Sequence, residues 1–357
     1  MSKKPLILGI ESSCDETAAS LITENEQGNP VVLSNIISSQ VDVHKKFGGV
    51  VPELAARSHM EKIDWIVQKA IDDSGRKIEE IDAVASTAGP GLIVCLSVGL
   101  SFGKAFASAL EKPFIAVNHL EGHALSPKLN SSLNYPYLLL LISGGHSQFL
   151  NVQGLGNYKR LGTTIDDALG EAFDKTAKLL GIEFPGGPQI EVLAKKGDPN
   201  KYDLPKPIFN KGGCNLSFAG LKTAILRISK NIKTEQEKFD LAASFQKTVE
   251  EILYKKTKIA FTDFEKQNKV EKKVFVVAGG VAANQNIRSM LTNLCFEENY
   301  QSIFPPIEFC GDNAAMIAIV GLEKFKLKQF NELDHPAKPR WPLDENAAFL
   351  KGAGVKL

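Results

Sequence analysis

Two stretches decide the fold, Leu6-Ile-Leu-Gly-Ile-Glu-Ser-Ser-Cys-Asp-Glu-Thr17 and Leu138-Leu-Leu-Leu-Ile-Ser-Gly-Gly-His-Ser-Gln148. In each, an apolar run typical of a buried strand leads into a turn of small and hydroxyl residues. A second strand is predicted after each turn, over 18–22 and over 149–152. Because these strand-turn-strand units lie about half a chain apart, they indicate an internal duplication into two lobes with a cleft between them, although they share little sequence identity.

Further strands and helices alternate along the rest of the chain. Short apolar runs predict strands over 83–85, 114–117 and 274–278. Amphipathic spacing predicts helices over 53–74, where Gly75 follows, and over 239–259. Strands that alternate with helices predict an α/β fold.

Composition limits the class of protein. The chain has 357 residues, enough for two domains of ordinary size, and its 43% hydrophobic and 23% charged residues are typical of globular proteins. It carries 42 Lys and Arg against 41 Asp and Glu, a net charge of +1. A global basic field is therefore excluded, and any contact with nucleic acid must depend on a local patch.

Cysteines and apolar runs indicate a cytoplasmic protein. The five cysteines are odd in number and form no CxxC pair, which favours a reducing compartment over a disulfide framework or a zinc ribbon. The first residues show no targeting segment. The uncharged stretch 83–103 has about the length of a membrane span, but Gly89-Pro90-Gly91 interrupts it. We therefore expect a buried strand, turn and helix there, and no membrane partner.

His119-Leu-Glu-Gly-His123 is the strongest local signal for chemistry. Two histidines at i and i+4 lie on one face of a helix, at a spacing that lets both imidazoles hold one metal ion. The alternative is a surface or capping pair between a strand and a helix. A metalloprotease H-E-x-x-H motif has its glutamate directly after the first histidine. Glu121 comes two residues after His119 and is expected to point away from both imidazoles, so the motif is not that of a peptidase.

Glycine-rich turns after predicted strands form a second signal. They lie at 142–146, at 186–187 and at 278–284. Glycines let backbone amides approach phosphate oxygens, and a helix that follows adds its dipole. One such turn is weak evidence, but three favour a nucleotide site. The chain has neither a P-loop nor a Rossmann fingerprint.

Four carboxylates lie beside these turns and predicted helices. Glu11 and Asp15 flank the first turn, Asp174 lies in Gly170-Glu-Ala-Phe-Asp-Lys175, and Asp312 precedes the apolar helix predicted over 314–320. Each could be a helix cap or a solvated charge, and Asp312 in particular suits an N-cap. Alternatively, a carboxylate near the two imidazoles would complete a metal site with open positions, which suits Lewis-acid chemistry.

Taken together and in order, the motifs resemble the TsaD family (also called Gcp or YgjD), the tRNA N6-adenosine threonylcarbamoyltransferases. The resemblance runs from about Leu6 to Trp341 and rests on eight motifs: Gly9-Ile-Glu-Ser-Ser-Cys-Asp-Glu-Thr17, Gly49-Val-Val-Pro-Glu-Leu-Ala55, Asn118-His-Leu-Glu-Gly-His123, Ser143-Gly-Gly-His146, Asp166-Asp-Ala-Leu-Gly-Glu-Ala-Phe-Asp-Lys175, Ser217-Phe-Ala-Gly-Leu-Lys-Thr223, Ala278-Gly-Gly-Val-Ala-Ala-Asn284 and Asp312-Asn-Ala-Ala-Met316.

The resemblance implies a fold and its domain limits. The fold is that of actin, Hsp70 and sugar kinases, two duplicated α/β lobes around a central nucleotide cleft. Residues 1–130 with about 312–340 would form the N-terminal lobe, 131–311 the C-terminal lobe, and 341–357 a C-terminal tail.

The resemblance also implies an acyltransferase activity. Members transfer the threonylcarbamoyl group from threonylcarbamoyl-AMP to N6 of adenosine 37, in the anticodon loop of tRNAs that read codons starting with A, and release AMP. Bacterial members work with the TsaB protein, a paralogue that pairs with the N-terminal lobe, and with the ATPase TsaE.

Site residues follow from the resemblance motif by motif. His119, His123 and Asp312 would hold one divalent metal ion per subunit, iron in preference to zinc. The adenylate substrate, or ATP or AMP in its place, would be bound by Ile142, Ser143, Gly144, Gly145, His146, Asp174, Gly187 and Asn284. Departures from the usual pattern are Ile93, Val94 and Cys95 in place of smaller residues, Gly311 where Thr is common, and Ser147 where Thr is frequent.

One catalytic residue comes from chemistry. An aromatic amine is a weak nucleophile, so a base is useful, and Glu11 beside the cleft is the candidate. The alternatives are an O-sialoglycoprotein-type metallopeptidase, a non-catalytic nucleotide-binding scaffold and a small-molecule kinase.

A long stretch rich in Pro, Gly and Lys, over 195–213, predicts either a solvated connector or a segment at the substrate. Its lysines are the expected local basic face for tRNA: Lys195, Lys196, Lys201, Lys206 and Lys211.

Overall fold

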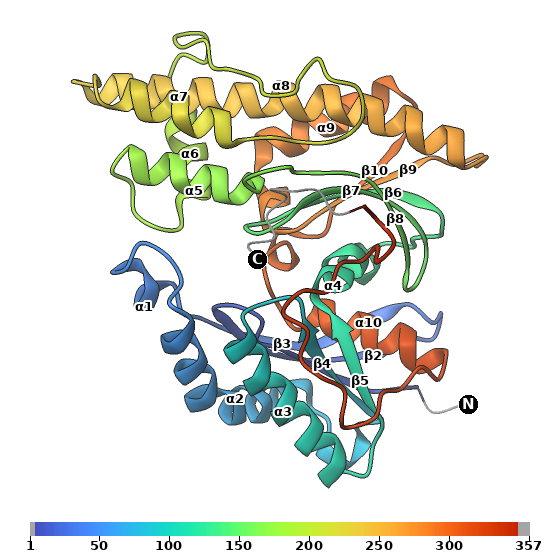
Figure 1. Ribbon diagram of the computed structural model, residues 1–357. Coiled ribbons are helices and arrows are strands. Elements are labelled where there is room, and N and C mark those ends of the chain that lie inside the picture. The colour runs from blue at the N-terminus through green and yellow to red at the C-terminus, as the bar shows by residue number, and fades with distance from the viewer. Residues whose placement is uncertain (1–3, 349–357) are drawn as a thin grey trace. The chain divides into compact units, whose positions relative to one another are not determined.

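The computed structural model describes residues 4–348 and divides into two compact units (Figure 1). The first unit takes its described residues from Met1–Leu133 and Pro305–Glu345, and the second from Asn134–Phe304 and Asn346–Leu357. Each unit contains a five-stranded sheet with helices packed against it. The predicted α/β class is therefore confirmed.

The sheet of the first unit combines antiparallel and parallel pairs. Its strands are β1 (Ile7–Glu11), β2 (Glu16–Glu24), β3 (Pro30–Ser39), β4 (Ala83–Gly89) and β5 (Phe114–Asn118). They lie in the order β3-β2-β1-β4-β5. The pairs β1/β2 and β2/β3 are antiparallel, whereas β1/β4 and β4/β5 are parallel.

The sheet of the second unit repeats this topology. Its strands are β6 (Tyr137–Ile142), β7 (Ser147–Gly154), β8 (Asn157–Thr163), β9 (Val274–Ala278) and β10 (Gln301–Ile303). Their order, β8-β7-β6-β9-β10, matches β3-β2-β1-β4-β5 strand for strand, with the same parallel and antiparallel pairs. The topology thus confirms the duplication indicated by the two strand-turn-strand stretches.

Helices cover both faces of the first sheet. The α-helices are α1 (Val41–Lys45), α2 (Pro52–Ser74), α3 (Ile93–Ala109), α4 (His119–Leu125) and α10 (Ala315–Lys326), and the 3-10 helices are η1 (Ile78–Glu80), η2 (Ser126–Leu129) and η4 (Ile307–Phe309). Figure 1 shows α2 and α3 together on one side of this sheet. Leu8 and Ile10 of β1 belong to the apolar core on that side. On the opposite side a Cβ at Gly9 would lie 2.5 Å from the carbonyl oxygen of Ala314, so glycine lets α10 approach β1 closely.

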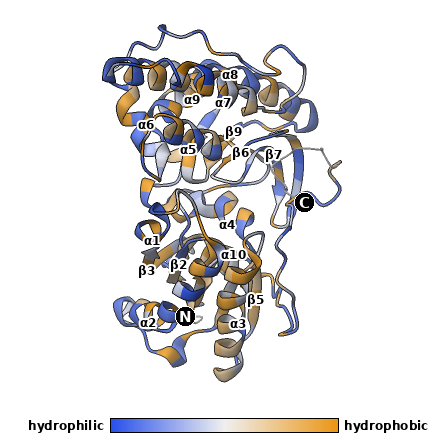
Figure 2. Ribbon diagram, turned by 60° about the vertical axis from the view of Figure 1, so that its left-hand side comes forward, coloured by the Kyte–Doolittle hydropathy of each residue, from blue (hydrophilic) through white to orange (hydrophobic). Residues whose placement is uncertain are grey.

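Helices of the second unit pack around the long helix α8. They are α5 (Leu169–Leu179), α6 (Gly186–Ala194), α7 (Ala219–Ser229), α8 (Glu235–Gln267), α9 (Gln285–Glu297) and the 3-10 helix η3 (Gly280–Ala283). Orange and blue residues alternate along α8 in Figure 2, as expected of a helix with one buried face. It begins at a capping box made by Thr234 and Glu237, and is longer than the predicted 239–259.

The stretch between α6 and α7, residues 195–218, lies along α8, and we call it the α8 strap. Successive turns of α8 hold it through Asp240, whose Oδ1 accepts from the Asp198 amide at 2.9 Å, and through Ser244, whose Oγ accepts from the Tyr202 amide at 3.1 Å. At its other end Leu216 pairs with Thr163 and Ile165 beside β8. The strap is therefore a surface segment with fixed contacts along its length.

Two smaller expectations are also settled by the described residues. All five cysteines are free, four of them buried, as their odd number and spacing indicated. No helix within residues 4–348 has the length and apolar character needed to cross a membrane.

Candidate metal centre and glycine turns

Helix α4 places both histidines on one side. Asn118 is its N-cap, because its Oδ1 accepts from the amides of Leu120 at 2.9 Å and Glu121 at 3.4 Å. The helix therefore begins at His119, and His123 follows one turn later with its ring centroid 4.8 Å away. Both side chains are buried, with residue exposures of 9% and 0%, which contradicts the alternative of a surface pair.

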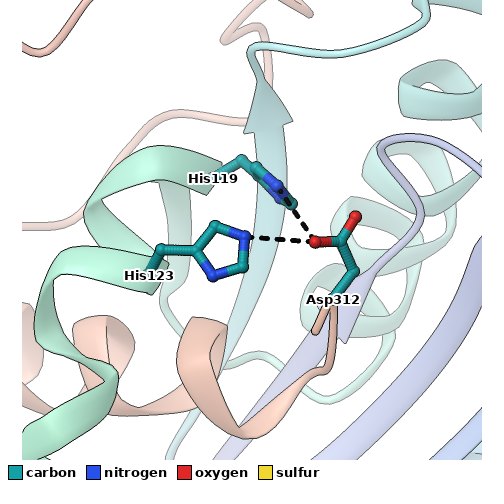
Figure 3. Close-up of side chains that lie close together, drawn as sticks. All are labelled: His119, His123 and Asp312. Atoms are coloured by element: carbon teal, nitrogen blue, oxygen red, sulfur yellow. Dashed lines mark hydrogen bonds and ion pairs between the residues drawn. The ribbon is translucent and has the colours of Figure 1, made fainter. Parts of the chain in front are cut away.

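Asp312 joins the two histidines (Figure 3). Its Oδ1 lies 3.1 Å from Nε2 of His123 and 3.5 Å from Nε2 of His119. The alternative interpretation of Asp312 as the N-cap of the following helix is wrong. Ala314 occupies the N-cap position, and Oδ1 of Asn313, one residue earlier, accepts a hydrogen bond from the Met316 amide at 3.0 Å. Asp312 is thus left to face the imidazoles.

These three residues fit a divalent metal ion. Their ligand atoms all lie within 4.8 Å of one another. Bonds of about 2.0–2.2 Å to one ion would hold the three ligand atoms about 3–3.6 Å apart, so small movements of the side chains would bring them into binding distance of one ion. Two imidazoles and one carboxylate form the facial set of non-haem iron sites, and they also match catalytic zinc with an open position.

Glu11 supports the site from behind His119. It ends β1 and is fully buried. Its Oε2 lies 3.0 Å from Nδ1 of His119 and accepts a hydrogen bond from Oγ1 of Thr87 at 2.6 Å. Its Oε1 accepts from the Ser13 amide. Glu11 therefore orients the imidazole, as carboxylates commonly do for metal-bound histidines.

Charges in this pocket are strongly coupled. Burial disfavours the charged forms of His119, Glu11 and Asp312, but the attraction between the imidazolium and the two carboxylates outweighs it. The pKa of His119 is raised well above its usual value by Asp312 and Glu11, and the pKa values of Glu11 and Asp312 are held low by His119. Burial, with Asp312 and Asp15 nearby, raises the pKa of Glu16 to about 9. The pocket thus favours a positive charge between its carboxylates.

Glu121 takes no part in this cluster. Its Oε2 lies 3.2 Å from Nζ of Lys324 on α10, and its side chain is nearly fully buried. The prediction that Glu121 points away from the imidazoles is confirmed, and the arrangement of an H-E-x-x-H peptidase is not present in the described residues.

A second group of predicted residues gathers in the second unit, where β6 and β9 run parallel. The turn Ser143–His146, which we call the glycine turn, follows β6. Its ends are tied, because the Ser143 amide donates to the His146 carbonyl at 2.8 Å and the His146 amide donates to Ser143 Oγ at 3.1 Å. Gly144 and Gly145 are exposed, and no atom lies within 4 Å of the position of a Cβ on either one. The turn therefore leaves its backbone open to a ligand.

Gly170 lets helix α5 pack closely against the glycine turn. It was not among the site residues predicted from the sequence. Its amide donates to the Ser143 carbonyl at 3.1 Å. A Cβ at Gly170 would lie only 2.8 Å from Gly144 Cα and from the Ser143 oxygen. The sequence signal for it is weak, because a glycine is unfavourable inside a helix but the helix itself was not predicted.

The remaining predicted binding residues hold nearby helices. Asp174 accepts from the Gly186 amide at 2.8 Å, which ties α5 to the start of α6, where Gly187 follows. Asn284 caps α9 by accepting from the Ile287 amide at 3.0 Å, and it exchanges two hydrogen bonds with Gln246. Gly279 lets β9 end beside β6, because its φ is 95° and a Cβ would lie 2.4 Å from the Ile142 oxygen.

Comparison with known proteins identifies the family. The model of the family described as "TsaD: tRNA N6-adenosine threonylcarbamoyltransferase" matches residues 31–319. The chain belongs to the TsaD family. A protein of Pelagibacter ubique with the name tRNA N6-adenosine threonylcarbamoyltransferase is 82% identical over all of both chains. One of the same name from Rickettsia rickettsii is 53% identical over 95% of this chain and 98% of its own length.

Solved structures agree on the fold. The HypF protein of T. kodakarensis matches with a TM-score of 0.61 at 14% identity, over 91% of this chain and 48% of its own. Full-length HypF, solved in a phosphate- and nucleotide-bound form, matches with a TM-score of 0.58 at 13% identity, over 93% of this chain and 48% of its own. The predicted actin-like ATPase fold is thereby confirmed. As a TsaD-family member the protein is an acyltransferase that forms threonylcarbamoyladenosine in tRNA.

Proposed function

We propose that this chain transfers the threonylcarbamoyl group of threonylcarbamoyl-AMP to N6 of adenosine 37 in tRNAs that read codons starting with A. The observation that carries the proposal is that the buried His119 and His123 and the partly exposed Asp312 form a metal-type cluster in a chain of the TsaD family. The exposed amine of adenosine 37 attacks the carbamoyl carbon, the bond from that carbon to the phosphate oxygen breaks, and AMP leaves with the electron pair. The proton lost from N6 passes to a base.

His119, His123 and Asp312 hold one divalent metal ion in this proposal. Iron(II) is favoured over zinc, because two imidazoles and one carboxylate on one side of the ion are the ligand set of non-haem iron sites. When bound, the metal supplies Lewis-acid polarisation of a carbonyl or phosphoryl oxygen. The role of the chain is to hold the three donors in place.

Glu11 has two possible roles. The sequence predicted it as the catalytic base. Its contacts support a positioning role instead, since its carboxylate already faces the Ser13 amide, Thr87 and His119. We propose that Glu11 accepts a hydrogen bond from Nδ1 of His119. The lone pair of Nε2, the nitrogen that faces Asp312, is then free to bind a metal ion.

The adenylate binds in the second unit, through Ile142, Ser143, Gly144, Gly145, His146, Asp174, Gly187 and Asn284, and ATP or AMP can occupy the same place. The open backbone of the glycine turn suits phosphate oxygens, and the N-terminus of α5 lies against that turn. Asp174 and Asn284 already accept hydrogen bonds from helix N-termini, so their proposed contribution is to hold the glycine-rich turns in shape.

The proposal extends to partners, compartment and lobes. The protein acts in the cytoplasm on tRNA, together with a TsaB-like paralogue and a TsaE-like ATPase. We also still propose the domain limits expected from the sequence: an N-terminal lobe of 1–130 with about 312–340, a C-terminal lobe of 131–311 and a tail of 341–357. Of this tail, residues 349–357 lie outside the described part of the chain. Helix α2 exposes Trp65 (57%), an aromatic side chain that suits docking of the paralogue. Trp65→Glu should abolish co-purification with it, whereas Phe296→Glu, a change at an exposed aromatic of the second unit, should not.

Transfer itself is tested with the full chain, purified partners, threonylcarbamoyl-AMP and an unmodified tRNA that reads an A-starting codon. Mass spectrometry of the digested nucleosides should find threonylcarbamoyladenosine, and a tRNA in which adenosine 37 is replaced by guanosine should show none. His123→Ala with an intact fold should remove the product. Full activity of that variant, or no product from the unaltered enzyme, would refute the proposal.

A further inference from the structure

Positive charge is concentrated in one part of the second unit. Residues 195–238 contain ten Lys and Arg against four Asp and Glu, a net charge of +6, although the whole chain has a net charge of only +1. This basic segment comprises the α8 strap, α7 and the turn into α8. The rest of the chain is therefore slightly acidic, so any long-range attraction for a polyanion comes from the basic segment.

Two lysines of α8 hold the strap in place. Nζ of Lys255 donates to Asn210 at 2.7 Å. Lys256 is fully buried, and its Nζ donates to the carbonyl oxygens of Lys211 at 2.9 Å and Gly213 at 3.1 Å. Because a buried ammonium needs such partners, these contacts fix the strap in one position. The exposed cations of the strap are thus presented on an ordered surface.

Helix α7 presents all its cations on one side. At about 100° per residue, Lys222, Leu226, Lys230 and Arg227 fall within an arc of about 140°. All four side chains are exposed, whereas Leu221 and Ile225 on the other side are buried. Helix α7 contains no acidic residue. The charged residues on this outer face, including Lys230 at the C-cap, are therefore all basic, and they surround the exposed Leu226.

Most of these cations have no acidic partner. Among the described residues, none of the following forms an ion pair: Lys211, Lys222, Arg227, Lys230 and Lys233. By contrast, Lys206 of the strap pairs with Glu251 of α8, and Lys195 pairs with Glu191 at 3.9 Å, so two of the five lysines expected to face tRNA already have acidic partners. The unpaired cations lie mainly on α7 and in the turn that follows it, which sequence analysis had not included in the basic face.

We propose that the basic segment, with α7 at its centre, is the surface on which the sugar-phosphate backbone of tRNA docks. The inference rests on the tRNA acyltransferase function of the family. Lysines on an exposed helix face contact phosphates without reading sequence, which suits an enzyme that must accept several tRNAs. Docking of this kind supplies affinity and orientation, while the choice of adenosine 37 is made at the reaction site.

Salt dependence of tRNA binding tests the proposal directly. The double variant Lys222→Gln/Lys230→Gln removes two charges from α7. Each lost phosphate contact lowers the slope of log affinity against log salt by about 0.7–0.9, so the slope should fall by about 1.4–1.8. If the variant and the unaltered chain bind tRNA equally at about 1 M salt, this slope difference means that the variant binds about 25- to 60-fold more weakly at about 0.1 M salt.

The matched control removes the same charge elsewhere on the second unit. Lys269 and Lys272 are exposed and lie beyond the other end of α8. Lys269→Gln/Lys272→Gln should bind tRNA like the unaltered chain. If the α7 variant keeps the original slope, or if the control loses as much affinity as the α7 variant, the proposal is overturned. Lys222→Arg/Lys230→Arg should restore binding, and its failure to do so would also refute a phosphate contact.

Kinetics separate this proposal from the proposed function. In the transfer assay the α7 variant should raise KM for tRNA and leave kcat at saturating tRNA unchanged, because α7 carries none of the proposed site residues. If the unaltered enzyme makes product and the α7 variant has an unchanged KM for tRNA, the docking surface is refuted and the transfer activity is not. An unaltered enzyme that makes no product, yet binds tRNA with the expected salt slope, would refute the transfer activity and leave the surface standing.

Discussion

The substitution Glu11→Gln separates the two roles of Glu11. Oε1 of Glu11 accepts from the Ser13 amide, so the glutamine is expected to keep its oxygen there and turn its NH2 group toward Thr87 and His119. The imidazole must then accept at Nδ1 and carry its proton on Nε2, the atom that faces Asp312. The nitrogen needed for a metal would thus be blocked.

The expected loss is in metal affinity. Loss of an outer-shell partner of a metal-bound histidine typically lowers affinity about 10- to 100-fold, which is about 1.4–2.8 kcal/mol. Competition with a chelator of known affinity measures this, with iron(II) and zinc(II) tested separately. The matched control is Glu121→Gln, a buried carboxylate on α4 that pairs with Lys324, for which the affinity should stay within about twofold.

Transfer rate decides the alternative. If Glu11 were the base, Glu11→Gln would leave metal content unchanged and lower kcat at saturating metal, typically by about 100- to 10,000-fold. The positioning role instead predicts that excess metal restores most of kcat. Unchanged metal affinity in Glu11→Gln, with circular dichroism showing an intact fold, would refute our reasoning.

Further predictions follow from individual contacts. Gly170→Ala should weaken AMP binding and lower the free energy of unfolding by about 1–3 kcal/mol through overpacking, as checked by calorimetry, whereas Gly280→Ala, at a position with open space, should change neither. Asn284→Ala should lower the free energy of unfolding by about 1–3 kcal/mol in urea denaturation, since α9 loses its cap and the buried Gln246 loses two hydrogen bonds, and an unchanged midpoint would contradict this. Asp312→Asn should lower metal content measured by mass spectrometry at least tenfold, and full metal content would exclude it as a ligand. Burial holds the pKa of His59 below 6.5, so as pH falls the imidazole is protonated in the unfolded chain before it is protonated in the folded one. The free energy of unfolding should therefore decrease as pH falls from about 7.5 to below about 6.5. In thermal melts, His59→Gln should show a smaller decrease.

The central strands and the edge strand β5 could be predicted from sequence, but the edge strands β3, β8 and β10 could not. Strand β6 is buried on both faces because neighbours flank it and helices cover it, so its residues are uniformly apolar. Strands β3 and β8 carry polar residues such as Asn35 and Lys159, so neither forms the apolar run that indicates a buried strand. Their hydrogen bonds to β2 and β7 define them, and these bonds exist only after the sheet has formed.

The metal cluster was only partly visible from local patterns. The i, i+4 spacing of His119 and His123 could be seen directly, because helix geometry places such residues together. Asp312 lies 189 residues from His123, and Glu11 lies 108 residues from His119, so no spacing rule connects them. The family resemblance supplied Asp312, but the support that Glu11, Ser13 and Thr87 give to His119 required the folded sheet.

Close packing of α10 on β1 also constrains how the chain folds during synthesis. Gly9 and Gly321 bring these two elements together, so this side of β1 is covered by a helix near the end of the chain. A nascent chain therefore contains Asn134–Phe304, most of the second unit, before this layer of the first unit leaves the ribosome. Until then the apolar face around Ile7 lacks its helix, and a chaperone has its clearest target there.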